Sequence, residues 1–455
     1  MKITIREDIY FSKHGISMDT TKRIRETFTY ENPIYIRMQK LGKRCYGVPK
    51  NIELLSESVD SYHLPRGVLR QLVPIINNNL SFDDQTVTKQ VEFPESNLEL
   101  RDYQRDALQS LLKSNQGILV SPCGSGKTEI ATALIKKRSQ KTLVLVHTKD
   151  LMQQWRDRIQ SRLNIGAGII GGGLWDDSKS ITIATVQSLQ SGLSTDFTDQ
   201  FGLVILDEGH HAPARTFSDV INQFPARFRY GLTATPTRAD RLEFLMKAAF
   251  GRVLYEIKTD ALETHVMTPT VRIIETTTYF PAVDSYNDLL AGLFKDEARN
   301  RLIVETINKE AAPGHSCLVL SQRISHIKAL QGLLNERNPA ISTALITGKE
   351  SSAYRNESIE KARTGEIKVI FSCRIADEGL DIPRLDRLFL CAPIRSTARL
   401  TQQVGRIRRP FPGKTDAVVF DFVDPLVSLA KSQSYTRINL YKNENFRIER
   451  FSYGS

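Results

Sequence analysis

The sequence has 455 residues, of which 62 are Lys or Arg and 51 are Asp or Glu, so its formal net charge is +11 at pH 7. This length predicts about three domains, and the basic balance favours a polyanionic partner, nucleic acid above all, although charge alone does not exclude a merely solvated surface. The five scattered cysteines form no Cys-x-x-Cys pair and no apolar run reaches the length of a signal peptide or membrane span, so we expect a soluble cytoplasmic protein without a disulfide framework, a zinc site or a membrane partner.

Residues 1–90 are predicted to form a small N-terminal α/β module. Residues 2–6 alternate like a strand, residues 17–28 have the capped pattern of a helix, and residues 35–38 again resemble a strand. The first 50 residues hold 11 Lys or Arg against 5 Asp or Glu, so this part of the module could bind a phosphate backbone. A module that only braces its neighbour is a nearly equal alternative. The polar residues 77–85 predict a linker or loop.

A phosphate-binding loop is predicted at residues 121–128, Ser-Pro-Cys-Gly-Ser-Gly-Lys-Thr, between an apolar strand at residues 117–120 and a helical run at residues 129–135. Its glycines permit a tight turn with inward N–H groups, and the helix N-terminus favours a phosphate. Lys127 can reach the β- and γ-phosphates, and Thr128 can offer its hydroxyl to Mg²⁺. The alternative is a glycine turn with an incidental lysine. The predicted nucleotide-binding residues here are Ser121, Pro122, Cys123, Gly124, Ser125, Gly126, Lys127 and Thr128.

An acidic pair follows a second apolar strand at residues 203–206. In phosphate-loop NTPases an acidic residue at a strand end holds Mg²⁺, and this role suits Asp207. Glu208 could orient or deprotonate the attacking water. Alone the pair would be an exposed acidic turn, but downstream of a phosphate-binding loop it predicts an NTPase.

Short apolar runs alternate with helical segments from about residue 98 onward. They occupy residues 117–120, 142–146, 181–184 and 203–206 in a first block and residues 317–320, 343–346, 369–371, 387–390 and 417–420 in a second. Such alternation predicts parallel sheets wrapped by helices. We therefore expect an α/β fold with two tandem parallel-sheet domains, residues 91–262 and 263–455, after the small N-terminal module.

The motifs and their order resemble those of the superfamily 2 helicases over roughly residues 98–424. The matching segments are Leu100-Arg-Asp-Tyr-Gln104, the phosphate-binding loop, Asp207-Glu-Gly-His210, Leu232-Thr-Ala-Thr-Pro236, residues 376–383 and Gln402-Gln-Val-Gly-Arg-Ile-Arg-Arg409. This resemblance implies that both parallel-sheet domains are RecA-like and that the cofactors are ATP and Mg²⁺. One departure is Arg408, which occupies a position where the family often has Gly.

The resemblance also implies further site residues. Gln104 is expected to read the adenine, and Asp381 belongs to the nucleotide site. Residues that couple hydrolysis to domain movement are His210, Thr233, Thr235 and Gln402. Residues that match the family's nucleic-acid backbone contacts are Thr148, Thr185, Ser372 and Arg374, although a hydroxyl at a strand end can instead cap a helix.

Arg406 and Arg409 are predicted to be arginine fingers. Phosphoryl transfer gathers negative charge on the γ-phosphate oxygens, and a guanidinium can stabilise that charge. Because the two residues are three apart, they can lie on one face of a helix. Since they belong to the second block, they would reach the nucleotide only when the two blocks close, which would gate hydrolysis. A generic basic surface is the alternative.

Within the superfamily, residues 100–104, residues 233–240 and the small N-terminal module are similar to the XPB-like and UvsW-like branch. The compact phage members of that branch remodel forks and Holliday junctions. We therefore expect an ATP-dependent DNA helicase or translocase that acts on forked or junction DNA in replication, recombination or repair, in the host cytoplasm if a phage encodes it. The alternatives are an RNA helicase, a restriction-type duplex translocase and a nucleic-acid clamp with an inactive nucleotide site.

Two further segments have a structural interpretation. Residues 171–173 are three glycines, which we interpret as a flexible loop. In the tail, residues 431–455, basic and aromatic residues interleave. Such a mixture can bind single-stranded nucleic acid, but we favour packing of the aromatic rings on the second domain.

Overall fold

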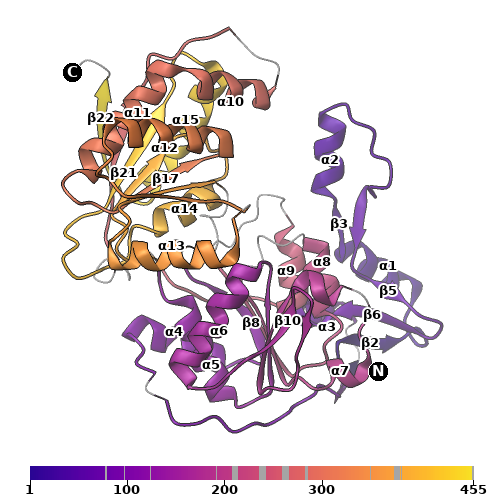
Figure 1. The fold of residues 1–455 in the computed structure, drawn as a ribbon. Coiled ribbons are helices and arrows are strands. Elements are labelled where there is room, and N and C mark those ends of the chain that lie inside the picture. The colour runs from indigo at the N-terminus through magenta and orange to yellow at the C-terminus, as the bar shows by residue number, and fades with distance from the viewer. Residues whose placement is uncertain are drawn as a thin grey trace. The chain divides into compact units, whose positions relative to one another are not determined.

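The structure is a computed structural model that describes residues 1–76, 79–96, 98–122, 124–190, 192–207, 214–234, 242–258, 266–281, 285–348, 350–373, 380 and 382–452. The chain divides into two compact units. The first holds Met1–Pro122 and Gly126–Ile257, and the second holds Cys123–Ser125 and Lys258–Ser455. Both units are mixed α/β structures (Figure 1). None of the helices in the described ranges combines the length and the apolar character that a bilayer crossing requires.

The N-terminal module is a five-stranded sheet in the order β5-β6-β2-β1-β7. Its strands are β1 Lys2–Ile5, β2 Asp8–Ser12, β5 Ser56–Glu57, β6 Ser61–Pro65 and β7 Ser81–Asp84, and it also holds the helices α1 Met18–Thr27 and α3 Leu69–Ile76. The predicted loop at residues 77–85 is therefore wrong in part, because β7 pairs in parallel with β1 despite its polar sequence.

A hairpin with a helical tip projects from this module (Figure 1). The strands β3 Thr29–Glu31 and β4 Asn51–Glu53 pair as a ribbon, and α2 Pro33–Lys40 lies between them in the chain. The predicted strand at residues 35–38 is wrong. Asn32 caps the helix by accepting the N–H of Ile34, and Pro33 occupies the first turn, where it needs no donor.

The module and the neighbouring parallel sheet share one hydrophobic core. Ile3 and Leu64 of the module belong to the same buried cluster as Val204 and Phe224. Arginines also join the two parts through backbone carbonyls. Arg66 donates to the carbonyl of Ala226 at 2.7 Å, and Arg229 Nη2 donates to the carbonyl of Glu7 at 2.6 Å. Both arginine side chains are buried.

The larger sheet of the first unit has the order β11-β10-β12-β9-β13-β14-β8-β15. Its strands are β8 Gln116–Val120, β9 Thr142–Val146, β10 Gly168–Gly171, β11 Leu174–Trp175, β12 Ile181–Thr185, β13 Leu203–Asp207, β14 Phe228–Thr233 and β15 Val253–Glu256. The accompanying helices are α4 Asp102–Leu112, α5 Lys127–Arg138, α6 Lys149–Leu163, α7 Thr195–Thr198, α8 Ala214–Ile221 and α9 Glu243–Phe250. Apart from the β10–β11 hairpin, all pairings are parallel.

The second unit holds a parallel sheet in the order β18-β19-β17-β20-β21-β16-β22. Its strands are β16 Thr270–Glu275, β17 Cys317–Ser321, β18 Thr343–Ile346, β19 Val369–Cys373, β20 Arg387–Leu390, β21 Val418–Val423 and β22 Arg447–Ser452. Its helices are α10 Tyr286–Lys295, α11 Glu297–Ala311, α12 Ile324–Arg337, α13 Ser352–Thr364, α14 Thr397–Gly405 and α15 Ser428–Asn443.

The tail packs on this second sheet through α15 and β22. Tyr441 is fully buried, and Arg437 is buried in an ion pair with Asp421 at 2.8 Å. The packing interpretation is confirmed for these residues and for Phe446, which is also buried. Tyr435 and Phe451 are 56% and 42% exposed, so the interpretation does not extend to every ring.

Candidate ATP site

Three predicted nucleotide-site motifs lie at the carboxyl ends of the neighbouring strands β8, β14 and β13. In register, Val120 pairs with Thr233 and Asp207 pairs with Leu232. The phosphate-binding loop, the Thr233 motif and the acidic motif therefore leave the sheet along the same edge. Parallel α/β sheets bind ligands at this edge, because the loops and helix N-termini that follow the strands converge there.

The described residues of the phosphate-binding loop have the backbone geometry that a tight glycine turn requires. Its first residue, Ser121, is buried, and its N–H donates to the carbonyl of Thr233 at 2.8 Å. Gly124 and Gly126 have φ angles of 86° and 78°, in the left-handed region that favours glycine. The helix α5 begins at Lys127, so its N-terminal N–H groups follow the loop directly. Lys127 and its neighbour Thr128 are half-buried.

Gln104 contacts the same loop. Its side chain is 4% exposed, and its Oε1 accepts the N–H of Arg101 at 3.0 Å, which caps α4. A Cβ atom added at Gly126 would lie 2.3 Å from Gln104 Nε2, so the side chain of Gln104 lies against the loop, while the positive φ of Gly126 favours glycine there. The structure thus places Gln104 beside the phosphate-binding loop. Its role as the adenine-reading residue stays a prediction.

Asp207 is held by a residue that the sequence interpretation missed. Its carboxylate is 5% exposed, and its Oδ2 accepts the indole N–H of Trp155 at 2.8 Å. Trp155 comes from α6 and is 1% exposed. A buried indole needs an acceptor for its N–H. A tryptophan in a helix that covers the sheet was therefore the one sequence signal for a contact with a buried polar group. Because the bond orients the carboxylate, Trp155 would position a metal ligand.

The two threonines predicted to bind a nucleic-acid backbone lie at the same edge of the sheet. Thr148 is the N-cap of α6, and its Oγ1 accepts the N–H of Leu151 at 3.2 Å. Thr185 ends β12, where its hydroxyl lies 2.7 Å from that of Ser188. The capping alternative therefore holds for Thr148. A backbone contact by either hydroxyl stays a prediction.

Two of the three glycines at residues 171–173, Gly171 and Gly172, approach this edge closely. All three have positive φ, at 151°, 64° and 91°. A Cβ atom added at Gly171 would lie 3.2 Å from Thr185 Oγ1, and one added at Gly172 would lie 3.3 Å from Lys149 Nζ. The interpretation as a flexible loop missed this proximity, because sequence spacing does not reveal which loops meet at a sheet edge.

The arginine motif lies in the second unit, at the end of α14. Gln402, 4% exposed, belongs to the helix, which ends at Gly405. Arg406 is the C-cap residue and Arg409 lies beyond it. The expectation that both arginines share one helix face is therefore wrong. Both side chains are half-buried, and Arg406 Nη1 donates to the carbonyl of Leu380 at 3.1 Å.

Ser372 does not fit its predicted contact with a nucleic-acid backbone. Its side chain has no exposed surface, and its hydroxyl donates to the carbonyl of Ile346 at 2.8 Å, across the sheet. The hydroxyl therefore stabilises the pairing of β19 with β18. Six predicted site residues lie outside the described part of the chain, and they are Cys123, Glu208, His210, Thr235, Arg374 and Asp381.

Comparisons with known proteins agree with this arrangement. Residues 97–238 match the family described as Type III restriction enzyme, res subunit, and residues 298–410 match the family described as Helicase conserved C-terminal domain. The DNA 3'-5' translocase XPB2 of Sulfurisphaera tokodaii is 28% identical over 72% of this chain and 82% of its own length. The probable helicase D10 of Escherichia phage T5 is 25% identical over 98% of this chain and 95% of its own length.

A solved structure shows the same fold. Yeast Dbp5 bound to RNA and ADP BeF3 has a TM-score of 0.59 at 16% identity and covers 77% of this chain and 89% of its own. The fold and the site together define a nucleotide-hydrolysing protein with two tandem RecA-like domains and a small N-terminal α/β module. The chain belongs to the superfamily 2 helicases and is an ATP-dependent helicase, and its sequence is similar to XPB-like and phage relatives.

Proposed function

We propose that this helicase is a DNA motor that unwinds or branch-migrates forked or junction DNA. The ATPase part of this proposal is supported by one observation: the phosphate-binding loop, Thr233 and Asp207 lie at the same edge of the sheet. Lys127 would bind the β- and γ-phosphates, while Thr128 and Asp207 would hold Mg²⁺, which neutralises charge on the transferred phosphoryl group. Arg406 and Arg409 would stabilise the transition-state charge during the hydrolytic cycle.

The choice of DNA is supported by the sequence relatives, one of which is a DNA translocase by name. ATPase and unwinding assays on forked DNA, Holliday-junction DNA, plain duplex DNA and RNA test it directly. We expect the forked and junction DNAs to give the highest turnover. Stimulation by RNA alone would instead identify an RNA helicase.

A basic arm supports the preference for branched DNA. We define it as residues 32–50, the segment between β3 and β4, and it holds five Lys or Arg and no Asp or Glu. All five basic side chains are exposed, and no ion pair involves them in the described ranges. Tyr46 is 97% exposed, and no residue of α2 is buried. The arm thus offers positive charge and a free aromatic ring, which suit a phosphate backbone and an unpaired base.

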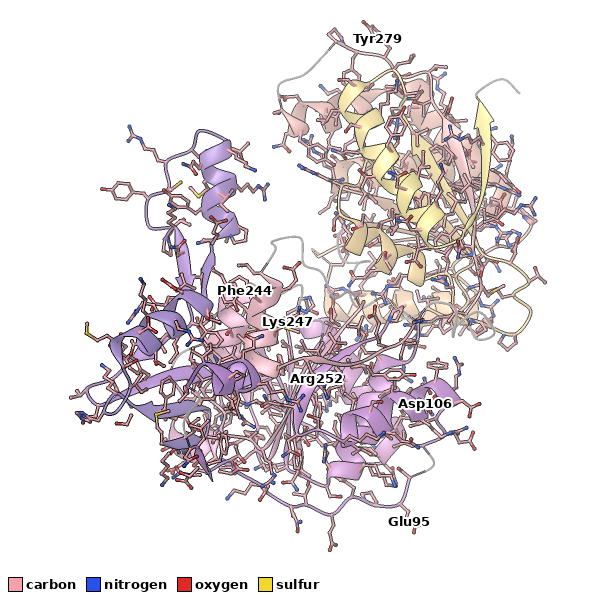
Figure 2. The ribbon with its side chains drawn as sticks, turned by 180° about the vertical axis from the view of Figure 1, so that it is seen from behind. Glu95, Asp106, Phe244, Lys247, Arg252 and Tyr279 are labelled. Atoms are coloured by element: carbon pink, nitrogen blue, oxygen red, sulfur yellow. The ribbon has the colours of Figure 1, made fainter. Side chains whose placement is uncertain are left out.

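The arm is fixed at its base, so it can hold a defined direction. Tyr30 of β3 stacks on Phe244 of α9 with ring centroids 4.2 Å apart. Figure 2 shows Phe244 at the foot of the arm. A short helix without buried residues is marginally stable alone, so the ribbon and this stacked pair must hold it in place. We infer that the arm contacts DNA beside the branch point.

Replacing Lys40, Lys43 and Arg44 by Ser should lower the preference for forks over plain duplex while leaving ATP hydrolysis without DNA unchanged. For each phosphate that the arm no longer neutralises, the slope of log affinity against log salt should also fall by about 0.9. Fluorescence-anisotropy titrations at several salt concentrations measure both effects. The matched control replaces three exposed lysines of the second unit, Lys309, Lys431 and Lys442, by Ser. An unaltered fork preference in the arm variant would leave the arm without a role in DNA binding.

Trp155→Phe should raise the Mg²⁺ concentration required for half-maximal ATPase activity by about 10-fold, because an orienting partner of a metal ligand typically contributes 10-fold to 100-fold in metal affinity. Phenylalanine keeps an aromatic ring in the site but cannot donate to Asp207. The other tryptophan, Trp175, is 55% exposed, so Trp175→Phe is the control. Equal Mg²⁺ requirements for the parent and Trp155→Phe would show that the indole does not position the metal ligand.

A further inference from the structure

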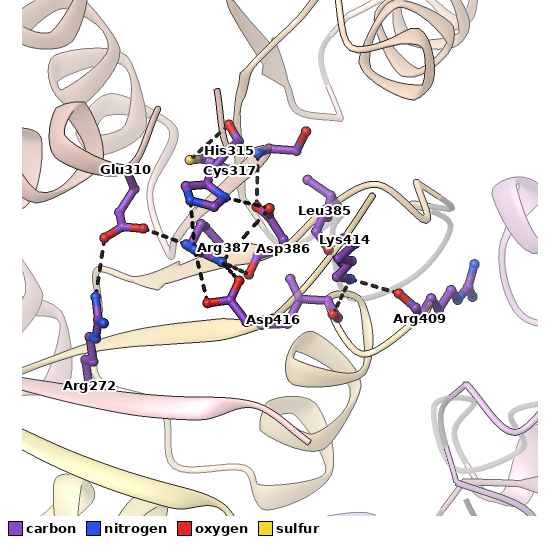
Figure 3. Close-up of polar contacts among 12 residues, drawn as sticks. Arg272, Glu310, His315, Cys317, Leu385, Asp386, Arg387, Arg409, Lys414 and Asp416 are labelled. Atoms are coloured by element: carbon purple, nitrogen blue, oxygen red, sulfur yellow. Dashed lines mark hydrogen bonds and ion pairs between the residues drawn. The ribbon is translucent and has the colours of Figure 1, made fainter. Parts of the chain in front are cut away.

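The turn that carries the two arginines is held by one lysine from the following loop. Lys414 Nζ donates to the carbonyls of Leu385 at 2.6 Å, Ile407 at 2.5 Å and Arg409 at 2.9 Å. Figure 3 shows the Lys414 side chain reaching the carbonyl oxygen of Arg409, whose guanidinium points the other way. An ammonium has three N–H donors, so these three carbonyls use its full capacity.

A tight turn directs this lysine back toward the arginines. The N–H of Lys414 donates to the carbonyl of Phe411 at 3.0 Å, and Gly413 has a φ of 80°. Pro412 and Gly413 occupy the positions that a type II turn assigns to these residue types. The direction of the Lys414 side chain therefore follows from local sequence, whereas its three acceptors come from tertiary packing.

Arg408 holds the same turn from another side. The N–H of Met267 donates to the Arg408 carbonyl at 2.8 Å, and Arg408 Nε donates to the Met267 carbonyl at 3.2 Å. The Arg408 guanidinium also lies 5.3 Å from the ring centroid of Phe446 and is buried. The three successive carbonyls of Ile407, Arg408 and Arg409 are thus all bound, which leaves the backbone between the two arginines little freedom.

We propose that Lys414 is a positioning residue for ATP hydrolysis, which holds Arg406 and Arg409 in the geometry that the transition state requires. This inference rests on the proposed role of those two arginines. The hydrogen bonds of Lys414 go to backbone carbonyls, so it would act through the backbone of the arginine turn. Without its three hydrogen bonds the turn could shift, and a displacement of about 1 Å can lower a rate by about 100-fold.

The protonation of Lys414 gives the proposal a distinct signature. The pKa of Lys414 is lowered from 10.5 to about 8, chiefly by burial; Arg387 and Arg409 also lower it, while Asp386 and Asp416 oppose the shift. The ammonium therefore predominates below about pH 8, and the neutral amine predominates above it. Because the amine has only two N–H groups, it cannot satisfy three carbonyls. The positioning effect should be complete at low pH and decline as the pH rises through this value.

The test compares Lys414→Met with the parent and with Lys431→Met, an exposed lysine on α15. DNA-stimulated ATPase kcat and KM are measured between about pH 6.5 and pH 9.5, a range that brackets the lysine titration, with melting curves at each pH. We expect Lys414→Met to lower kcat by about 10-fold to 100-fold at neutral pH with an unchanged KM for ATP. In the parent and in Lys431→Met, kcat should decline as the pH rises above about 8. In Lys414→Met this decline of kcat should be absent.

A parental kcat and pH profile in Lys414→Met would overturn the proposal. If that variant does not fold, Lys414→Arg tests the proposal instead. The planar guanidinium of arginine keeps the positive charge but does not fit three converging carbonyls. It should give a kcat between those of the parent and Arg409→Ala, and a parental kcat and pH profile would again overturn the proposal. Failure of the proposed function is distinguishable, since Arg409→Ala would then retain full turnover whatever Lys414 does.

Discussion

Lys127→Ala should abolish ATP hydrolysis while leaving DNA binding intact. Lys127 is the first residue of α5 and follows Gly126 directly, so its ammonium and the helix N-terminus are expected to act on the same phosphates. The loss of one preorganised charge from a phosphoryl-transfer site should lower kcat by on the order of 1,000-fold, the upper range for removal of a transition-state donor. Steady-state ATPase assays with saturating DNA measure this loss, and anisotropy measures DNA binding.

A control on the same helix makes this test specific. Lys137 lies near the other end of α5 and is exposed. Lys137→Ala therefore removes an equal charge from the same element without approaching the phosphate-binding loop. Its turnover should equal that of the parent. Turnover at the parental rate in Lys127→Ala would mean that the nucleotide site is misplaced.

The second large effect is expected for Arg409→Ala, which should keep nucleotide binding but lose turnover. An arginine finger typically contributes 10³-fold to 10⁵-fold to kcat, because it stabilises charge that develops only in the transition state. Binding of a fluorescent ATP analogue should be unchanged, whereas single-turnover hydrolysis should fall by about 10³-fold or more. Arg409→Lys should recover little of the loss, since an ammonium cannot reproduce the planar fork.

A matched arginine again provides the control. Arg301 lies on α11 of the same unit, its side chain is 73% exposed, and its ion pair with Glu297 is on the surface. Exposed pairs of this kind contribute about 0–1 kcal/mol to stability, so Arg301→Ala should behave like the parent. If Arg409→Ala hydrolyses ATP at the same rate as Arg301→Ala, the arginine-finger role is excluded.

Local patterns predicted the elements whose signal lies within a few residues. The strands at residues 343–346 and 387–390 have the predicted bounds, because short apolar β-branched and aromatic runs between polar segments are typical of buried parallel strands. The loop from Ser121 to Thr128 also has its predicted strand and helix on either side. The conformation of this loop is determined locally, because its own glycines permit the positive φ angles that it requires.

Features that depend on distant contacts were missed. Trp155 is 52 residues from its acceptor Asp207, and no periodicity links them. Ser372 has the residue type of a backbone contact, but its pairing across the sheet with Ile346 buries the hydroxyl. The apolar residues at 35–38 predicted a strand because the segment is too short to reveal a helical period. The N-cap at Asn32 and Pro33 in the first turn instead begin a helix, residues 33–40.

The end of α14 shows a similar limit for Arg406 and Arg409. A spacing of three residues is compatible with a helix face, but the helix ends at Gly405, and the turn beyond it is set by Lys414 and Arg408. Lys414 lies outside the matched motif, and Arg408 occupies a position within it where the family often has Gly. Tertiary hydrogen bonds to backbone carbonyls therefore determine geometry that motif matching cannot predict.

The common core of the N-terminal module and the first RecA-like domain limits how such a protein can evolve. Its leucine and isoleucine side chains interlock with those of the motor, and Arg66 and Arg229 each span the boundary to a main-chain oxygen on the other side. Because the module shares its core with the motor domain, it cannot be exchanged between related motors as an independent domain. New DNA preferences would arise more readily by changing the exposed basic arm, whose residues between Pro33 and Lys50 bear no part of the shared interior.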